Sequence, residues 1–152
     1  KVNRPDPPLE IFNSDQDAIL SSMIEIDTEK PVNVIDITGR VGQAVQESGV
    51  ESGLALVYVM HTTCGLTVNE ADGALIDDML SLLQRLVPRG AGYRHDRGDG
   101  NAHAHLRSML LSSSAVIPVE NGEPAMGAWQ RILFLEIDGP RRRKIMVRTI
   151  PA

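Results

Sequence analysis

The sequence contains one cysteine, Cys64, which excludes a disulfide within the chain. Phe, Trp and Tyr make up only 3% of the residues, too few for the aromatic platform on which single-stranded nucleic acids stack. No apolar run reaches the roughly 18 residues of a membrane-spanning helix, and the chain shows no signal peptide. We therefore expect a cytoplasmic protein that does not engage a membrane.

Clustered positive charge is also scarce, since the chain carries a net charge of -5. Binding to nucleic acid requires Lys and Arg gathered on one surface to displace counterions from phosphates, so we expect neither DNA nor RNA as a partner. The one basic run, residues 141–144, falls in a predicted hairpin turn. It is interpreted either as a solvated turn or as a contact for an anion.

A length of 152 residues suits one hydrophobic core. Residues 1–18 begin with three prolines in eight positions and show no apolar periodicity, which predicts a loose N-terminal arm. Residues 19–152 carry the periodic segments and are predicted to form a single domain.

Alternating apolar residues predict strands, and an apolar period of 3.6 residues predicts helices. We expect one hairpin from strands over 19–27 and 32–37, and another from the last two strands around residues 138–140. About seven strands with two to three helices, without regular βαβ alternation, indicate an α+β domain on an antiparallel or mixed sheet. The other predicted elements are a helix capped by Thr38 and ended by Gly49, two strand segments within 53–69, a helix over 72–87 closed by Pro88, a helix after Asn101, and a hairpin at Asn121–Gly122.

Residues 93–111 contain three of the four histidines, His95, His103 and His105, and His61 is the fourth. Neutral imidazole is the commonest metal ligand, so these residues indicate either a metal site or histidines that cap loops and face water. On the helix predicted after Asn101, His103 and His105 stand about 200° apart, so only one of them faces a given site. Periodicity does not choose between them.

A series of motifs runs through the chain in a fixed order. They are HTTCGLTVNE at 61–70, RLVP at 85–88, YRHDRGDGNAHAH at 93–105, LRSMLLSSS at 106–114, GAWQ at 127–130 and EIDGPRRR at 136–143. In order and spacing they resemble the YjbQ-like, or secondary thiamine-phosphate synthase, family over about residues 30–150. The resemblance implies an α+β fold containing a two-layer β-sandwich, assembled as a homotrimer.

The resemblance also implies which residues form the site. It implies a divalent metal ion held by His61, His95 and His105, with His103 outside the ligand set. Zinc or another transition metal suits three imidazoles, and magnesium is expected to arrive with a phosphorylated substrate. Cys64 is interpreted as a small hydrophobic residue.

The activity that the resemblance implies is a metal-assisted transfer, in which a pyrimidine pyrophosphate joins a thiazole phosphate and pyrophosphate leaves. Such chemistry needs hydrogen-bond donors and cations around the phosphate oxygens. Two alternatives remain open: a metal-dependent hydrolase of a phosphate ester or amide with Glu70 or Asp99 as base, and a non-catalytic trimer that binds a metal or a small phosphorylated ligand. The expected roles are catalytic for Asn69, Glu70 and Asp99, and substrate-binding for Thr62, Thr63, Gln130 and Arg141.

Overall fold

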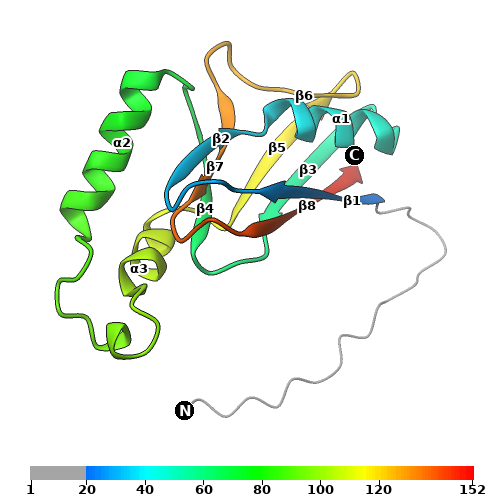
Figure 1. The fold of residues 1–152 in the computed structure, drawn as a ribbon. Coiled ribbons are helices and arrows are strands. Elements are labelled where there is room, and N and C mark those ends of the chain that lie inside the picture. The colour runs from blue at the N-terminus through cyan, green and yellow to red at the C-terminus, as the bar shows by residue number, and fades with distance from the viewer. Residues whose placement is uncertain (1–19) are drawn as a thin grey trace, which may run out of the picture.

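The computed structural model describes residues 20–152 (Figure 1). The arm predicted over residues 1–18 lies outside this range. The strands are β1 (Leu20–Asp27), β2 (Asn33–Asp36), β3 (Ser52–Val59), β4 (Cys64–Asn69), β5 (Ser114–Glu120), β6 (Glu123–Pro124), β7 (Arg131–Glu136) and β8 (Arg142–Pro151). The helices are α1 (Thr38–Ser48), α2 (Gly73–Leu86) and α3 (Ala102–Leu110), with one 3-10 turn over Arg94–Arg97.

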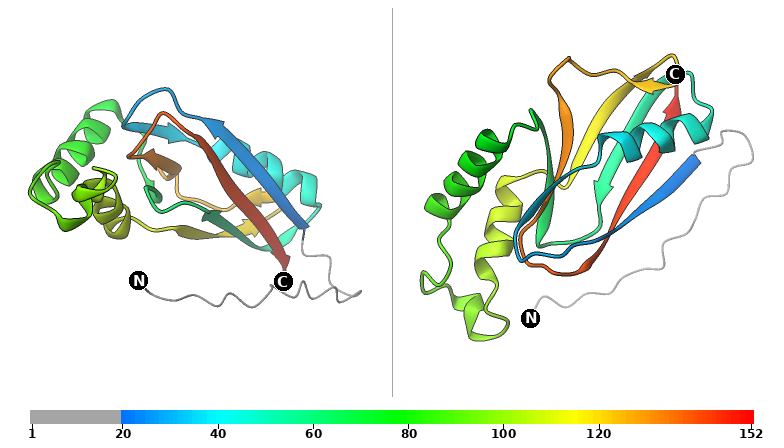
Figure 2. Two further views of the ribbon diagram at one scale, coloured as in Figure 1. Left: turned by 60° about the horizontal axis from the view of Figure 1, so that its bottom comes forward. Right: turned by 45° about the horizontal axis from the view of Figure 1, so that its top comes forward.

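The strands form two antiparallel sheets, and their arrangement confirms the predicted α+β sandwich (Figure 2). The five-stranded sheet has the order β1-β8-β3-β5-β6, and the three-stranded sheet has the order β2-β7-β4. Apolar side chains of both sheets meet those of α1 in one core, which includes Val45, Val57 and Phe134. Strand β7 is buried on both faces, because Leu133 and Leu135 pack on its other side against Leu83 of α2. Within residues 20–152, no helix combines the length and the apolar character needed to cross a membrane.

Two of the predicted hairpins are wrong. β1 pairs with β8 in the five-stranded sheet, whereas β2 pairs with β7 in the three-stranded sheet. The turn at residues 138–140 likewise leads from β7 in one sheet to β8 in the other. An alternating pattern identifies a strand and its buried face, but it leaves the partner strand undetermined. The hairpin at Asn121–Gly122 is confirmed, and both residues have the positive φ, 53° and 73°, that a tight two-residue turn favours.

The helices begin at or next to the predicted residues, but the predicted capping side chains do not always make the capping bond. Asp72 caps α2 as its N-cap, with its Oδ1 accepting a bond from the Leu75 amide at 2.9 Å. The N-cap of α1 is Ile37 instead of Thr38, because the Thr38 hydroxyl accepts a bond from the Ile132 amide of β7. Thr38 therefore joins α1 to the three-stranded sheet and does not cap the helix.

Asn101 is the N-cap of α3, as predicted, yet its side chain makes no capping bond. Its Nδ2 instead donates to Asp138 Oδ2 at 2.9 Å, across 37 positions of sequence. The Ala102 amide at the helix start donates to Asp96 Oδ1 at 3.0 Å. The start of α3 is thus tied both to the preceding 3-10 turn and to the loop between β7 and β8.

Candidate functional site

An open pocket of about 660 Å³ lies where the chain crosses between the two sheets. It is lined by the β3–β4 connection and by residues at and near the start of α3. The β7–β8 connection and the first residues of β8 complete the lining. These segments are distant in sequence and meet because β3 and β8 belong to one sheet while β4 and β7 belong to the other. Its lining residues are Met60, His61, Thr62, Thr63, Asp99, Asn101, His105, Asp138, Arg141 and Arg143.

The structure brings the three predicted histidine ligands to this region. The His95 and His105 rings meet edge to face with their centroids 5.0 Å apart. His61 and His105 line the same pocket. The Nε2 atom of His61 accepts a bond from the Lys144 backbone amide at 2.8 Å, so in the neutral ring Nδ1 carries the proton and is a hydrogen-bond donor. Burial, followed by the nearby Arg143 charge, lowers the pKa of His61 and favours a neutral ring.

A divalent metal ion can be tested against this donor set. Imidazoles beside a carboxylate, Asp99, are ligands that a divalent transition metal accepts. Among residues 20–152, however, no group of three or more His, Cys, Asp or Glu side chains is gathered closely enough to hold one. The residue types therefore fit a metal, and a third ligand requires His61 or Asp99 to move toward the His95–His105 pair.

His103 occupies a different environment from His105, two positions away on α3. It is 6% exposed, and its Nδ1 has no hydrogen-bond partner within the described part of the chain. Burial, followed by the charges of Arg107 and Arg89, lowers its pKa. His103 is absent from the pocket lining, so α3 presents His105 alone to the pocket.

Asn69, Glu70 and Gln130 do not line the pocket. Cys64 at the start of β4 pairs with the last residue of β7, whereas Asn69 at its end pairs with Arg131. Five residues of strand span about 16 Å, so these three side chains lie near the opposite end of the three-stranded sheet. The side-chain Oε1 of Gln130 accepts a bond from the Gly127 amide in its own loop. Within one chain, the structure does not join them to the histidines.

Arg141 lines the pocket, but its guanidinium is bonded within its own loop. Its Nε donates to the Asp138 carbonyl at 2.8 Å and its Nη2 to Asp138 Oδ2 at 2.9 Å. The same carboxylate oxygen accepts from Asn101, so Asp138 connects Arg141 to the start of α3. Arg141 is 54% exposed, and this arrangement leaves it only partly available to a ligand.

The sequence interpretation missed a buried ion pair beside the pocket, Arg143 with Glu136. Arg143 donates from Nε to Glu136 Oε2 at 2.6 Å and from Nη2 to Oε1. Burial alone would raise the pKa of Glu136, but the bonds from Arg143, the Asp138 amide and Thr28 outweigh it and lower that pKa. The signal was present in the sequence: position 143 has the same parity as the buried Ile145 and Val147, so it faces inward on β8.

Cys64 is part of the core, as interpreted from the sequence. It is 1% exposed, and burial raises the pKa of its thiol to about 12. A thiol protonated at neutral pH is a poor nucleophile and a poor metal ligand. Cys64 thus packs as a small hydrophobic residue.

A second cavity of about 690 Å³ adjoins the first and shares Met60, His61, Thr62 and His105 with it. Apolar side chains add to its lining, among them Tyr58, Met109 and Leu111. The site as a whole therefore offers a polar, charged part next to an apolar part.

The fold and the pocket define a class of small α+β protein, with two antiparallel sheets and a histidine-bearing pocket where the chain crosses between them. The sequence model of one family, described as UPF0047 protein YjbQ-like, matches residues 22–152. The chain belongs to this family, as the motif series predicts.

Relatives of known sequence and structure agree with this assignment. A UPF0047 protein of Archaeoglobus fulgidus is 49% identical over 127 residues, covering 84% of this chain and 98% of its own. The UPF0047 protein YugU of Bacillus subtilis is 40% identical over 129 residues, covering 82% and 95%. A crystal structure of an uncharacterized YjbQ/UPF0047 family protein from Clostridium acetobutylicum, 43% identical, covers 85% of this chain and 99% of its own with a TM-score of 0.81. A YbjQ-like protein of unknown function from Sulfolobus solfataricus, 33% identical, covers 88% and 98% with a TM-score of 0.85.

Proposed function

We propose that the pocket binds a small phosphorylated molecule and that the protein is a transferase of the thiamine-phosphate synthase kind. In this reaction the methylene carbon of a pyrimidine pyrophosphate bonds to the nitrogen of a thiazole phosphate, and pyrophosphate leaves with the electrons of the broken C–O bond. The observation that carries the proposal is the convergence of imidazole, hydroxyl and guanidinium groups in one open pocket beside an apolar cavity.

The charges of the lining support a requirement for a divalent cation. The positive charges of Arg141 and Arg143 are matched by the negative charges of Asp99 and Asp138, and Glu136 forms an ion pair with Arg143. A pyrophosphate group that enters this pocket therefore needs additional positive charge. His95 and His105, together with His61 through the Nε2 that it would release from the Lys144 amide, are the residues that would hold a zinc or other transition-metal ion, and magnesium would accompany the substrate. When bound, such an ion supplies charge stabilisation for the leaving pyrophosphate.

The protein's own groups have separate tasks in this proposal. Thr62 and Thr63 offer hydroxyl donors to phosphate oxygens from the β3–β4 connection. Asp99, an exposed carboxylate that lines the pocket, has no proton to move in this joining step, but in the alternative hydrolysis it would take the proton of the attacking water as a general base. The apolar cavity at Tyr58, Met109 and Leu111 receives a ring of the substrate.

The direct test is product formation. Protein loaded with metal and given the pyrimidine pyrophosphate and the thiazole phosphate should form thiamine phosphate, and His61→Ala should reduce the rate at least about 100-fold. His103→Ala, a histidine outside the pocket, is the matched control. Loss of pyrophosphate or phosphate without joining would identify a hydrolase instead. No product above a control without enzyme, or full activity in His61→Ala, would refute the synthase proposal.

We also propose that the chain assembles as a homotrimer through the outer face of the five-stranded sheet. On that face Leu54 lies opposite Ile150, and Leu56 lies opposite Val116. Val116 is 59% exposed, and no element among residues 20–152 packs over this face. An apolar sheet face of this kind is stabilised when another subunit covers it.

A further inference from the structure

We infer that Arg143 and Thr63 form the phosphate-oxygen receptor of the pocket, in place of the Arg141 that the sequence indicates. The inference rests on the proposed function, because it names the groups that contact the phosphorylated ligand. It follows from a comparison of Arg143 with Arg141: the number of guanidinium N–H groups that remain unpaired, and the bonds and burial that fix each side chain.

The donors of Arg143 can be counted. A guanidinium carries five N–H groups. Nε and Nη2 donate to the two oxygens of Glu136, and Nη2 also donates to Thr63 Oγ1 at 3.0 Å. Both N–H groups of Nη1 have no partner among the described residues. The side chain is 4% exposed and lines the pocket, so this free edge is a buried cation that a ligand can reach only from the pocket.

Thr63 completes the receptor. Its hydroxyl accepts from Arg143, which leaves its proton free to donate, and within residues 20–152 that proton has no recorded acceptor. The residue is 6% exposed and also lines the pocket. Two adjacent donors, one of them cationic, suit an anionic oxygen in a partly desolvated place.

Glu136 gives the receptor its rigidity. It has no exposed surface, and it accepts further bonds from the Ile137 and Asp138 amides at 2.9 Å each and from Thr28 at 3.0 Å. Arg143 is therefore held in one orientation before any ligand arrives, which lowers the entropic cost of binding. Glu136 is a positioning residue in this scheme.

Arg141 lacks these features. Its Nε and Nη2 donate to Asp138, and 54% of its side chain is exposed to solvent. A solvent-screened cation that is already paired with a carboxylate contributes little to affinity. We expect it to guide approach and to leave the bound state nearly unchanged.

The test measures binding of inorganic pyrophosphate with Mg²⁺ by isothermal titration calorimetry. Removing Arg143 alone would leave Glu136 as an unpaired buried charge, so both members are replaced as Arg143→Met with Glu136→Gln. This variant should lose about 10- to 100-fold in affinity, the value of a hydrogen bond to a charged group. Arg141→Ala should lose less than about threefold. Arg142→Ala is the matched control, because Arg142 pairs with the exposed Asp27, and this variant should bind like wild type.

A second variant keeps the ion pair and protects the test against a folding defect. Thr63→Val should reduce affinity about fivefold, because valine has nearly the shape of threonine but lacks its hydroxyl, so one neutral donor is lost. Wild-type affinity in the folded double variant, or in Thr63→Val if the double variant does not fold, overturns the receptor while leaving the proposed function intact. A large loss in Arg141→Ala alone also overturns it. Absence of pyrophosphate binding by the wild type refutes the phosphate-binding proposal itself.

Discussion

Glu136 is the residue whose environment is most unusual in this protein. It is a carboxylate with no exposed surface, and Arg143, Thr28 and two backbone amides donate to it. A buried charge is tolerated only when it is paired and hydrogen-bonded, and here both conditions are met. The pair also joins the two sheets, because Glu136 ends β7 and Arg143 lies near the start of β8.

Replacing Glu136 with Gln should lower the free energy of unfolding by about 3–5 kcal/mol, because Arg143 keeps a buried charge without its partner. Urea denaturation followed by circular dichroism measures this loss. Adding Arg143→Met to the variant should recover part of it. A loss below about 1 kcal/mol in the single variant would contradict the account of the pair.

The same pair should make stability depend on acid. The folded pKa of Glu136 is lowered below its ordinary 4.5, so the carboxylate stabilises the fold above that pH, and the contribution is lost as pH falls through the lower folded value. The gap in unfolding free energy between wild type and Glu136→Gln should therefore be constant from about pH 6 to 8 and shrink below about pH 4. A gap that widens with acid would contradict the sign.

The two histidines of α3 provide the sharpest comparison for the metal. His105→Ala should lower bound metal per chain, because His105 contacts His95 and lines the pocket, whereas His103→Ala should leave it unchanged. Elemental analysis of the purified variants measures the stoichiometry, and circular dichroism controls for folding, since His103 is buried. Equal metal content in both variants would remove His105 from the ligand set.

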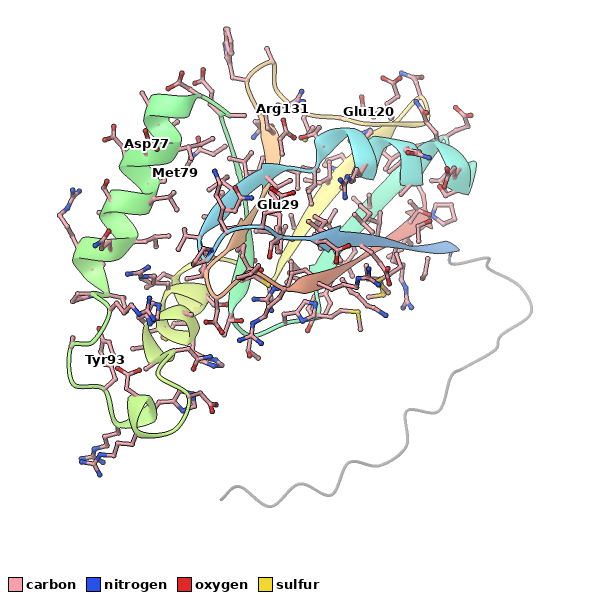
Figure 3. All side chains as sticks on the ribbon, in the orientation of Figure 1. Glu29, Asp77, Met79, Tyr93, Glu120 and Arg131 are labelled. Carbon is pink, nitrogen blue, oxygen red and sulfur yellow. The ribbon has the colours of Figure 1, made fainter. Side chains whose placement is uncertain are left out.

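At the scale of elements, α2 is held by its cap and by one apolar side. Met79 packs with Leu83 against the three-stranded sheet, while Asp77 lies on the outer side of the helix (Figure 3). Asp72 at its start satisfies the Leu75 amide, one of the four amides that a helix start leaves without an intrahelical partner. The cap fixes where α2 begins after β4.

Asp72→Ala should lower the free energy of unfolding by about 1 kcal/mol, because the Leu75 amide loses its acceptor. Hydrogen exchange should speed up first in the opening turn of α2. Asp77→Ala is the matched control, since its carboxylate is exposed and makes no hydrogen bond within residues 20–152. Equal effects of the two changes would show that charge near the helix start matters more than the cap.

At the scale of the whole molecule, the five-stranded sheet has one face in the core and one face outside, on which apolar side chains lie beside charged ones such as Arg148 and Lys144. The outer face joins Met23, Tyr58 and Met146 in one row across three strands. Such a face is an association site or an aggregation liability, and trimer formation would cover it. Met60 lines both cavities and Tyr58 lines the second, so the proposed assembly and ligand binding would share a region.

Val116→Glu should convert the proposed trimer into smaller species, because it places a charge in an apolar interface without a partner. Light scattering after size exclusion measures the mass, expected at three times 16.6 kDa for the wild type. Leu86→Glu, an equally exposed apolar position on α2, is the control. A stable wild-type monomer at micromolar concentration would refute the trimer.

The sequence by itself determined the local elements and the family. Periodicity placed α2 and α3, and the Asn121–Gly122 pair placed the turn after β5, because these features depend on neighbouring residues whose propensities agree. The motif series determined the family, and three of its motifs include residues that line the pocket, whereas Asn69, Glu70 and Gln130 lie outside it. Tertiary structure alone decided the pairing of β1 with β8 and of β2 with β7, since one alternating pattern is compatible with any partner strand. The parity of β8 indicates that Arg143 faces inward, but only the tertiary structure shows that the buried carboxylate of Glu136 lies there to pair with it, and that Arg141 stays exposed.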